Sequence, residues 1–162
     1  MKIGHAALSL LIVSPSAWSA SWAWSLPLIV LTVIIHVFGL LRIDQSVEHC
    51  ENKAVERYSF HVVFVVIIGA TALLATLLHG LEGMIWAAAY RLVGALPDDR
   101  SAVLYSLSAM TSYGHANLDL EKHWQLMGAL EALNGMLLFG LTTAFLFGII
   151  QRVWRLQSGR SS

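Results

Sequence analysis

Charged residues are scarce in this sequence, and their scarcity excludes several classes of protein. Asp, Glu, Lys and Arg make up 12% of the 162 residues, hydrophobic residues make up 57%, and the mean hydropathy is +0.67. Such a chain is far more apolar than an average soluble domain. The formal net charge is zero and no dense Lys/Arg run occurs, which argues against a nucleic-acid partner. The polar remainder is too short for a soluble catalytic domain, so we expect neither an enzyme nor a cofactor.

Cysteine is almost absent as well. The single cysteine, Cys50, lies in the polar stretch SVEHCENKAVER. Because a disulfide needs two cysteines, no intrachain disulfide can form. The residue therefore does not indicate a compartment.

Charge is missing almost entirely from three long stretches. No charged residue lies between positions 2 and 42, Glu82 is the only one between 58 and 90, and Glu131 is the only one between 123 and 151. A helix needs about 20 mostly apolar residues to cross the hydrocarbon of a bilayer. The sequence therefore predicts an all-α membrane protein with three transmembrane helices, at about Pro27–Ile43, Phe60–Tyr90 and Trp124–Val153.

Positive charges are distributed unevenly over the loops, which predicts an orientation. If two spans and a re-entrant loop separate the segments, one side of the membrane carries six cations: Arg42, Lys53, Arg57, Arg152, Arg155 and Arg160. The other side carries Arg91, Arg100 and Lys122. The excess of Lys and Arg marks the cytoplasmic side. We therefore expect a multi-pass protein of the inner (plasma) membrane whose C-terminus is cytoplasmic.

The first 25 residues allow three interpretations. A lysine, an apolar stretch and small residues around Ser21 resemble a signal peptide. The segment is otherwise a fourth, N-terminal hydrophobic helix, or a Trp-rich segment that lies in the membrane interface. These alternatives stay open at the level of sequence.

A shorter apolar run follows the second stretch. It extends from Ala102 to Met110, which is too short to cross a membrane but long enough for a half-helix. Asp98, Asp99 or Ser101 is suited to cap its first turn. A half-helix can enter the membrane and return only if its backbone is buried in protein or lines water. We expect a re-entrant helix over residues 101–111, whose negative C-terminal end favours a cation.

Three motifs in this order carry a resemblance to a known family. "LLHGLEGMIWAAAY", "YSLSAMTSYGHANL" and "GALEALNGMLLFGLTTAFLF" are similar to the outer helix, pore helix with filter, and inner helix of the bacterial ion-channel family related to two-pore-domain potassium channels. The resemblance covers residues 60–152. It implies a homotetramer in the lipid bilayer around one pore for a monovalent cation, K⁺ or Na⁺.

The apolar stretches, the charge distribution and the resemblance together divide the chain into segments. They are a hydrophobic or signal-like segment (1–25), a first transmembrane helix (26–43), a cytoplasmic loop (44–58), a pore domain (59–152) and a cytoplasmic tail (153–162).

The selectivity filter of that family resembles T-T-L-G-Y-G-D, and this chain departs from it. Its seven positions fall on Thr111, Ser112, Tyr113, Gly114, His115, Ala116 and Asn117. Glycines in such a filter permit the backbone conformation that aims carbonyl groups at the ion. Ala116 occupies a glycine position, where a left-handed conformation costs about 1 kcal/mol or more per chain. The resemblance with these departures implies a cation channel of weak K⁺ selectivity.

The alternative is a channel scaffold that does not conduct. In that interpretation a ring of His115 and Asn117 side chains binds a transition metal or responds to pH. Apart from His115 in this alternative, we expect no metal ligand.

Polar residues inside the apolar stretches are the remaining candidates for a site. We expect His79, Glu82, Glu131 and Asn134 to form a cluster that braces the pore helix, because ionisable residues in a span usually find a partner inside the protein. A proton or metal site is the alternative. His36 is expected well below His79, since it lies about six residues from the inner end of its span. This difference in level disfavours a haem held by two histidines.

Small residues recur in the third stretch. Glycines there let helices approach closely. Gly140 is also a candidate hinge in a pore-lining helix.

Overall fold

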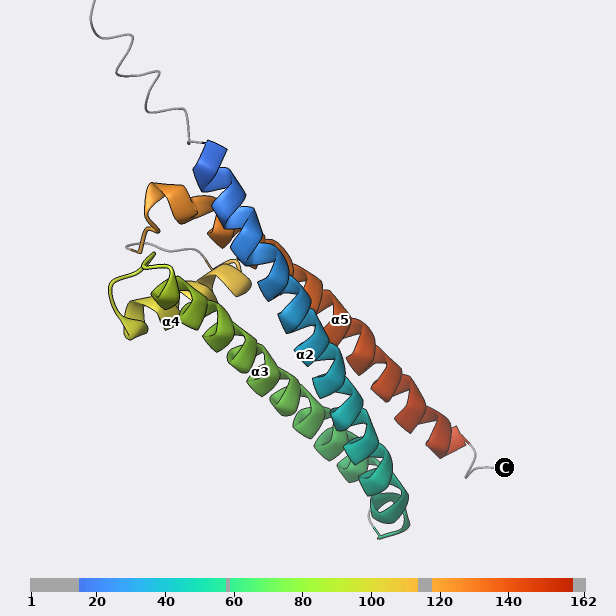
Figure 1. The fold of residues 1–162 in the computed structure, drawn as a ribbon. Helices are drawn as coiled ribbons and strands as arrows, with labels where there is room; N and C mark the ends of the chain where they lie inside the picture. Colours follow the sequence, from blue (N-terminus) through green and yellow to red (C-terminus); the bar gives the residue numbers. More distant parts are fainter. Residues whose placement is uncertain (1–14, 58, 114–117, 159–162) are drawn as a thin grey trace, which may run out of the picture. The chain divides into compact units, whose positions relative to one another are not determined.

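The computed structural model describes the backbone of residues 15–57, 59–113 and 118–158, and the side chains of 18–49, 59–113 and 118–155. Within these ranges every regular element is a helix, and no strand occurs. Figure 1 shows the elements, which are α2 (Pro15–Arg57), α3 (Phe60–Leu92), α4 (Asp99–Met110), the short 3₁₀ helix η1 (Lys122–Trp124) and α5 (Gln125–Ser158).

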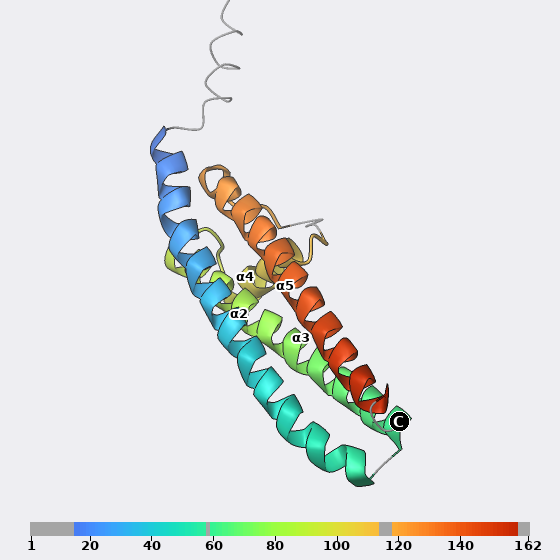
Figure 2. The same ribbon diagram turned by 90° about the vertical axis from the view of Figure 1, so that its right-hand side faces the viewer.

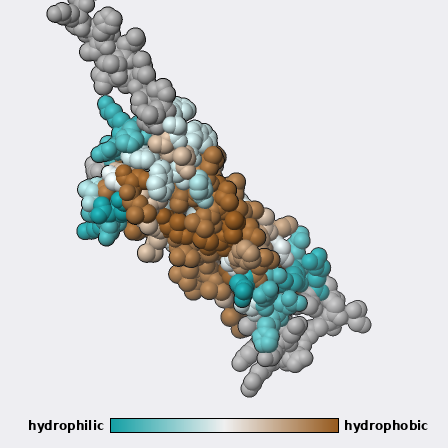
Figure 3. Space-filling model, viewed as in Figure 1, coloured by the Kyte–Doolittle hydropathy of each residue, from teal (hydrophilic) through white to brown (hydrophobic). Residues whose placement is uncertain are grey.

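Three of these helices are long and apolar enough to cross a membrane. Their candidate spans are Trp18–His49, Phe60–Leu92 and Lys122–Arg155. Large hydrophobic side chains such as Val30, Val65 and Phe139 are exposed on them. Hydrophobic residues form a broad continuous area on the face seen in Figure 3. The prediction of an all-helical chain with three long apolar helices is confirmed, and the surface is suited to lipid.

The first long helix extends beyond both of its expected ends. Residues 44–57, which we expected to form a loop, continue α2 as a helix, and α2 already begins at Pro15. The polar stretch contains Glu, Lys, Ala and Arg, which are strong helix formers, and no Gly or Pro interrupts it. We expected a loop because the stretch is polar, but a polar stretch of strong helix formers can continue a helix.

The chain forms two compact units. Unit 1 comprises Gly83–Gly135 with the N-terminal part up to Leu31, and unit 2 comprises Thr32–Glu82 with Met136–Ser162. Unit 1 contains α4 and η1. Its core is formed around the buried aromatic residues Trp86, Tyr90 and Trp124.

Unit 2 contains the remaining parts of the three long helices. These segments of α2, α3 and α5 lie side by side in both ribbon views (Figures 1 and 2). Their core contains Leu40, Val63, Ile67 and other aliphatic residues. At its polar end Arg152 on α5 donates to Asp44 on α2, with Nη1 2.7 Å from Oδ1.

Candidate functional site

The short helix α4 begins with a side-chain cap. Asp98 is the N-cap residue, and its Oδ1 accepts a hydrogen bond from the backbone N–H of Ser101 at 2.9 Å. That hydrogen bond lowers the pKa of Asp98 below its usual range. Next to it, Arg91 Nε donates to Asp99 Oδ1 at 2.6 Å. Of the three candidate caps, Asp98 has this role.

The C-terminal end of α4 is closed by a Schellman motif. Ser112 N–H donates to the carbonyl of Ala109 at 3.1 Å, and Tyr113 N–H donates to that of Ser108 at 3.0 Å. Ser112 has φ +55°, a left-handed conformation that is uncommon outside glycine. The first three expected filter residues, Thr111 to Tyr113, therefore cap a helix. Tyr113 is 87% exposed.

Glycines on the neighbouring helices provide the space that α4 occupies. A Cβ at Gly135 of α5 would lie 2.4 Å from the carbonyl oxygen of Met110, and one at Gly128 would lie 2.1 Å from the Tyr105 hydroxyl. A Cβ at Gly83 of α3 would lie 3.1 Å from Leu107. The Met110 contact is with backbone, which cannot move aside as a side chain can. The end of α4 thus lies directly against α5.

A buried carboxyl group holds the middle of α4. Glu131 of α5 is fully buried, and Ser106 Oγ lies 2.5 Å from its Oε1. The Tyr90 hydroxyl of α3 donates to Oε2 at 2.5 Å. The same Ser106 Oγ lies 2.7 Å from the carbonyl oxygen of Gly83. Glu131 therefore contacts α4 directly, through Ser106. We expected it to brace the pore helix in a cluster with His79, Glu82 and Asn134, whereas it forms hydrogen bonds with Ser106 and Tyr90.

The hydrogens at this site can be counted. A serine hydroxyl has one hydrogen, so Ser106 can donate either to Gly83 or to Glu131 but not to both. Both contacts are hydrogen bonds if Glu131 carries a proton and donates it to Ser106. In that state Ser106, Tyr90 and the protonated Glu131 each donate one hydrogen bond, and the Gly83 carbonyl accepts one. The site then carries no net charge.

The aromatic residues near this site are core residues. Trp and Tyr near the end of a membrane helix are often found at the membrane interface. In the structure Trp86 and Tyr90 are both 0% exposed. The Tyr90 ring meets the Tyr105 ring of α4 edge-on, with centroids 5.2 Å apart. Their role is to pack α4 against α3.

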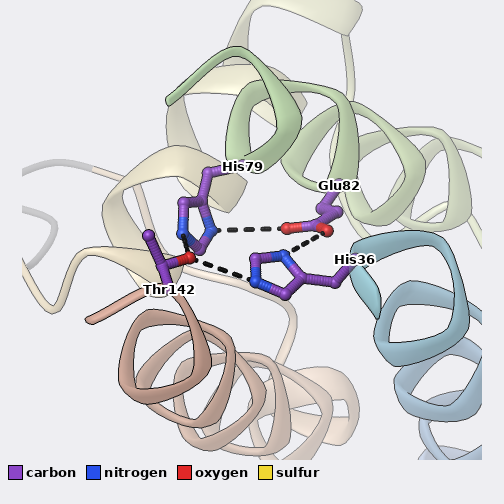
Figure 4. A network of polar contacts seen from close by, with 4 residues as sticks. All are labelled: His36, His79, Glu82 and Thr142. Atoms are coloured by element: carbon purple, nitrogen blue, oxygen red, sulfur yellow. Dashed lines mark hydrogen bonds and ion pairs between the residues drawn. The ribbon is translucent and has the colours of Figure 1, made fainter. Parts of the chain in front are cut away.

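A second polar cluster lies in unit 2 (Figure 4). Glu82 Oε1 is 2.9 Å from His36 Nδ1, and Glu82 Oε2 is 3.3 Å from His79 Nδ1. On the other side of both rings, Thr142 Oγ1 is 3.1 Å from His36 Nε2 and 3.0 Å from His79 Nε2. Figure 4 shows the four side chains as a closed ring, contributed by α2, α3 and α5. His36 and Glu82 are fully buried, and the His79 side chain is 24% exposed.

The expectation that His36 lies well below His79 was wrong. Their ring centroids are 5.0 Å apart. His36 precedes Arg57, the last residue of α2, by 21 residues, and His79 follows Phe60, the first of α3, by 19. At 1.5 Å per residue, His36 and His79 lie about 31 and 28 Å along their helices from the connection between α2 and α3. The two histidines are therefore at nearly the same level. The error came from ending the first helix near residue 43.

The remaining predicted residues have the following positions. Gly114, His115, Ala116 and Asn117 lie outside the described residues, so the second half of the expected filter and the His115/Asn117 ring stay predictions. Asn134 is buried in unit 1. Gly140 lies within α5, where an added Cβ would meet no other described atom within 4 Å, and its hinge role also stays a prediction.

Sequence analysis missed Tyr90, Ser106 and Thr142 as site residues. A serine or threonine in an apolar helix usually bonds to its own backbone four residues earlier, as Thr143 does with the Phe139 carbonyl at 2.9 Å. Thr142 is its neighbour in sequence, and no sequence signal separates the two. Only the packing of α2, α3 and α5 reveals which hydroxyl faces the histidines.

Three comparisons with known proteins found no relative of the chain. No family model, no curated protein and no solved structure matches the chain.

Proposed function

We propose that the chain is a pore-loop membrane protein, in which four copies surround one axis and conduct monovalent cations with weak preference for K⁺ over Na⁺. Helix α4 carries the proposal. It has 12 residues, so it rises about 18 Å, which is less than the roughly 30 Å of bilayer hydrocarbon. It lies in the sequence between two helices that are each long enough to cross.

The packing of α4 supports this function. A pore helix must hold its carbonyl end fixed beside the ion path, since small displacements change which oxygens face the ion. The end of α4 rests on Gly135, and its middle is held by Ser106 and Glu131. The helix therefore has the fixed position that a pore helix needs.

The conformation of residues 111–113 supports the altered filter. A K⁺ filter is formed by successive backbone carbonyls that replace the hydration shell of the ion. Thr111 is the C-cap of α4 with φ −92°, and Ser112 is left-handed. A chain that enters the filter positions as a helix cap offers fewer carbonyls in the extended arrangement, which is the basis for weak selectivity.

Reconstitution in planar bilayers tests the function. Bi-ionic reversal potentials are measured for the wild type, for His115→Gln and for the double change His115→Tyr with Ala116→Gly. We expect cation current with little K⁺ over Na⁺ discrimination in the wild type, and stronger discrimination in the double variant. Strong K⁺ selectivity of the wild type contradicts the altered filter. A silent wild type with a conducting double variant identifies the native loop as a plug, and a monomer in mild detergent contradicts the tetramer.

A further inference from the structure

The ring of His36, Glu82, His79 and Thr142 in unit 2 leaves one of its four contacts without a hydrogen bond. Three of the contacts are hydrogen bonds, and the fourth joins Glu82 Oε2 and His79 Nδ1 as an ion-pair contact only. Two neutral imidazoles supply one N–H each, the threonine supplies one O–H, and an ionised carboxylate supplies none. These three hydrogens complete the three hydrogen bonds, and none remains for the contact between Glu82 Oε2 and His79 Nδ1. A cation between these two atoms would bind both of them.

The charge of Glu82 leads to the same requirement. The carboxyl group is 0% exposed, and neutral imidazoles do not compensate a negative charge. A buried, unpaired carboxylate is costly, so proteins pair it with a cation or let it coordinate a metal. A cation placed between the carboxylate and the two rings compensates this charge and binds the oxygen that accepts no hydrogen bond.

We propose that His36, His79 and Glu82 bind one divalent transition-metal ion of the zinc class. Two imidazole nitrogens and one carboxylate oxygen are a donor set that zinc uses when it has three protein ligands. One ligand atom from each residue lies within 4.8 Å of the others. Bonds of about 2.0 Å to a tetrahedral ion separate the ligand atoms by about 3.3 Å. The spacing of the cluster therefore needs only small side-chain adjustments.

The carboxylate itself favours a metal. Glu82 Oε2 lies 3.3 Å from His79 Nδ1, but in the described part of the chain it accepts no hydrogen bond. Two polar atoms at this separation without hydrogen-bond geometry are arranged as two ligands of one ion are. Both Nδ1 atoms and this oxygen face the same space in Figure 4.

Thr142 completes the arrangement as a positioning residue. With the metal on the Nδ1 atoms, each neutral imidazole carries its hydrogen on Nε2, and both can donate to Thr142 Oγ1 at 3.0 and 3.1 Å. The threonine hydrogen is then available for a carbonyl of the preceding helical turn. In this state both imidazoles, the Thr142 hydroxyl and the metal-binding oxygen of Glu82 have partners. The fourth position on the ion remains open for water or an anion.

Metal binding by the purified full-length chain tests the proposal, independently of any current. The protein is stripped with a chelator, loaded with Co²⁺ or Zn²⁺, and analysed by metal content, by the visible spectrum of Co²⁺, and by competition with a chelator of known affinity. We expect one ion per chain and a tetrahedral Co²⁺ spectrum. Glu82→Gln and His36→Gln should abolish both, and Thr142→Val should weaken binding by about 10- to 100-fold, because it removes the partner of both imidazoles.

The matched controls are His61→Gln and His123→Gln, which change exposed histidines outside the ring. Both variants should bind the metal ion with the stoichiometry and affinity of the wild type. If Glu82→Gln or His36→Gln fails to fold, the Co²⁺ spectrum of the wild type and the affinity of Thr142→Val still decide. The proposal is overturned if the wild type holds no ion at saturating Zn²⁺, which would leave a shared proton as the cation, or if the control variants lose the ion equally.

Discussion

Glu82 and Glu131 are both buried, and they have the same side chain but different surroundings. Glu131 in unit 1 has contacts with hydroxyl groups, from Ser106 and Tyr90. Glu82 in unit 2 lies between two imidazole rings, those of His36 and His79. Both carboxyl groups are 0% exposed. The difference between them is therefore a difference of partners and not of burial.

The partners decide what each acid can do. Hydroxyl groups can donate to a carboxyl group and accept from it, but they do not bring positive charge. The Glu131 site is complete when the acid is neutral, so it acts as a hydrogen-bonding connection between α3, α4 and α5. Imidazoles offer lone pairs to a proton or a metal. The Glu82 site places two imidazoles beside a buried carboxyl group, so it is suited to binding a cation.

The largest expected effect comes from truncating the acid that holds α4. Glu131→Ala removes the partner of the buried Tyr90 hydroxyl and one of the two partners of Ser106, and an abandoned buried group costs about 1 to 3 kcal/mol. We expect the free energy of unfolding in detergent to fall by about 2 to 4 kcal/mol. Chemical denaturation followed by tryptophan fluorescence measures the loss.

Glu131→Gln is the matched control, and it sharpens the contrast between the two acids. A glutamine has nearly the same shape as a neutral glutamic acid and can both donate and accept. If Glu131 is neutral, the free energy of unfolding of this variant should fall by less than about 1 kcal/mol. Equal losses for glutamine and alanine would contradict the neutral acid. No loss for alanine would remove the bracing role.

A somewhat smaller effect is expected from the glycine beside the end of α4. The Cβ of Gly135→Ala would lie 2.4 Å from the Met110 carbonyl oxygen, so α4 or α5 must shift. Such overpacking costs about 1 to 3 kcal/mol. Gly148→Ala on the same helix meets no described atom within 4 Å and should stabilise slightly through helix propensity. Thermal unfolding of both variants compares them, and similar melting temperatures would show that α4 tolerates displacement.

Much of the fold could be predicted from the sequence, and the reason is physical. A backbone in hydrocarbon must satisfy its hydrogen bonds internally, so long uncharged runs form helices. This rule located α3 and α5 to within a few residues. The short helix α4 followed from the length of its apolar run and from the Asp98 cap. None of these inferences needed a contact between distant residues.

The candidate sites were harder to predict because they depend on the register between helices. His36 and His79 come together only because α2 continues as a helix to Arg57, and a polar stretch does not reveal whether it is a helix or a loop. Similarly, Ser106 and Thr142 are ordinary helix residues until packing places a carboxyl group or an imidazole beside them. Sequence found the acids, Glu82 and Glu131, and one partner, His79, which lies three residues from Glu82. It did not find the partners that come from other helices.

The smallest expected effect concerns a third acid, Asp98, which is exposed and lies outside the long apolar helices. The N–H of Ser101 donates to its carboxylate and lowers its pKa from the ordinary 3.8. A group with a lowered folded pKa stabilises the protein above its unfolded pKa, and this contribution is lost as the pH falls through the folded pKa. Asn caps a helix about as well as Asp but does not titrate and carries no charge. Asp98→Asn should therefore be slightly less stable than the wild type at pH 7, and the difference should shrink as the pH falls from about 3.8 through the lower folded pKa. Unfolding measured for both proteins at pH values from 7 to about 3 isolates Asp98, because the other acids titrate equally in both. Asp119→Asn changes another exposed acid and is the control. A difference that stays constant over this range would mean that the Asp98 charge does not stabilise the start of α4.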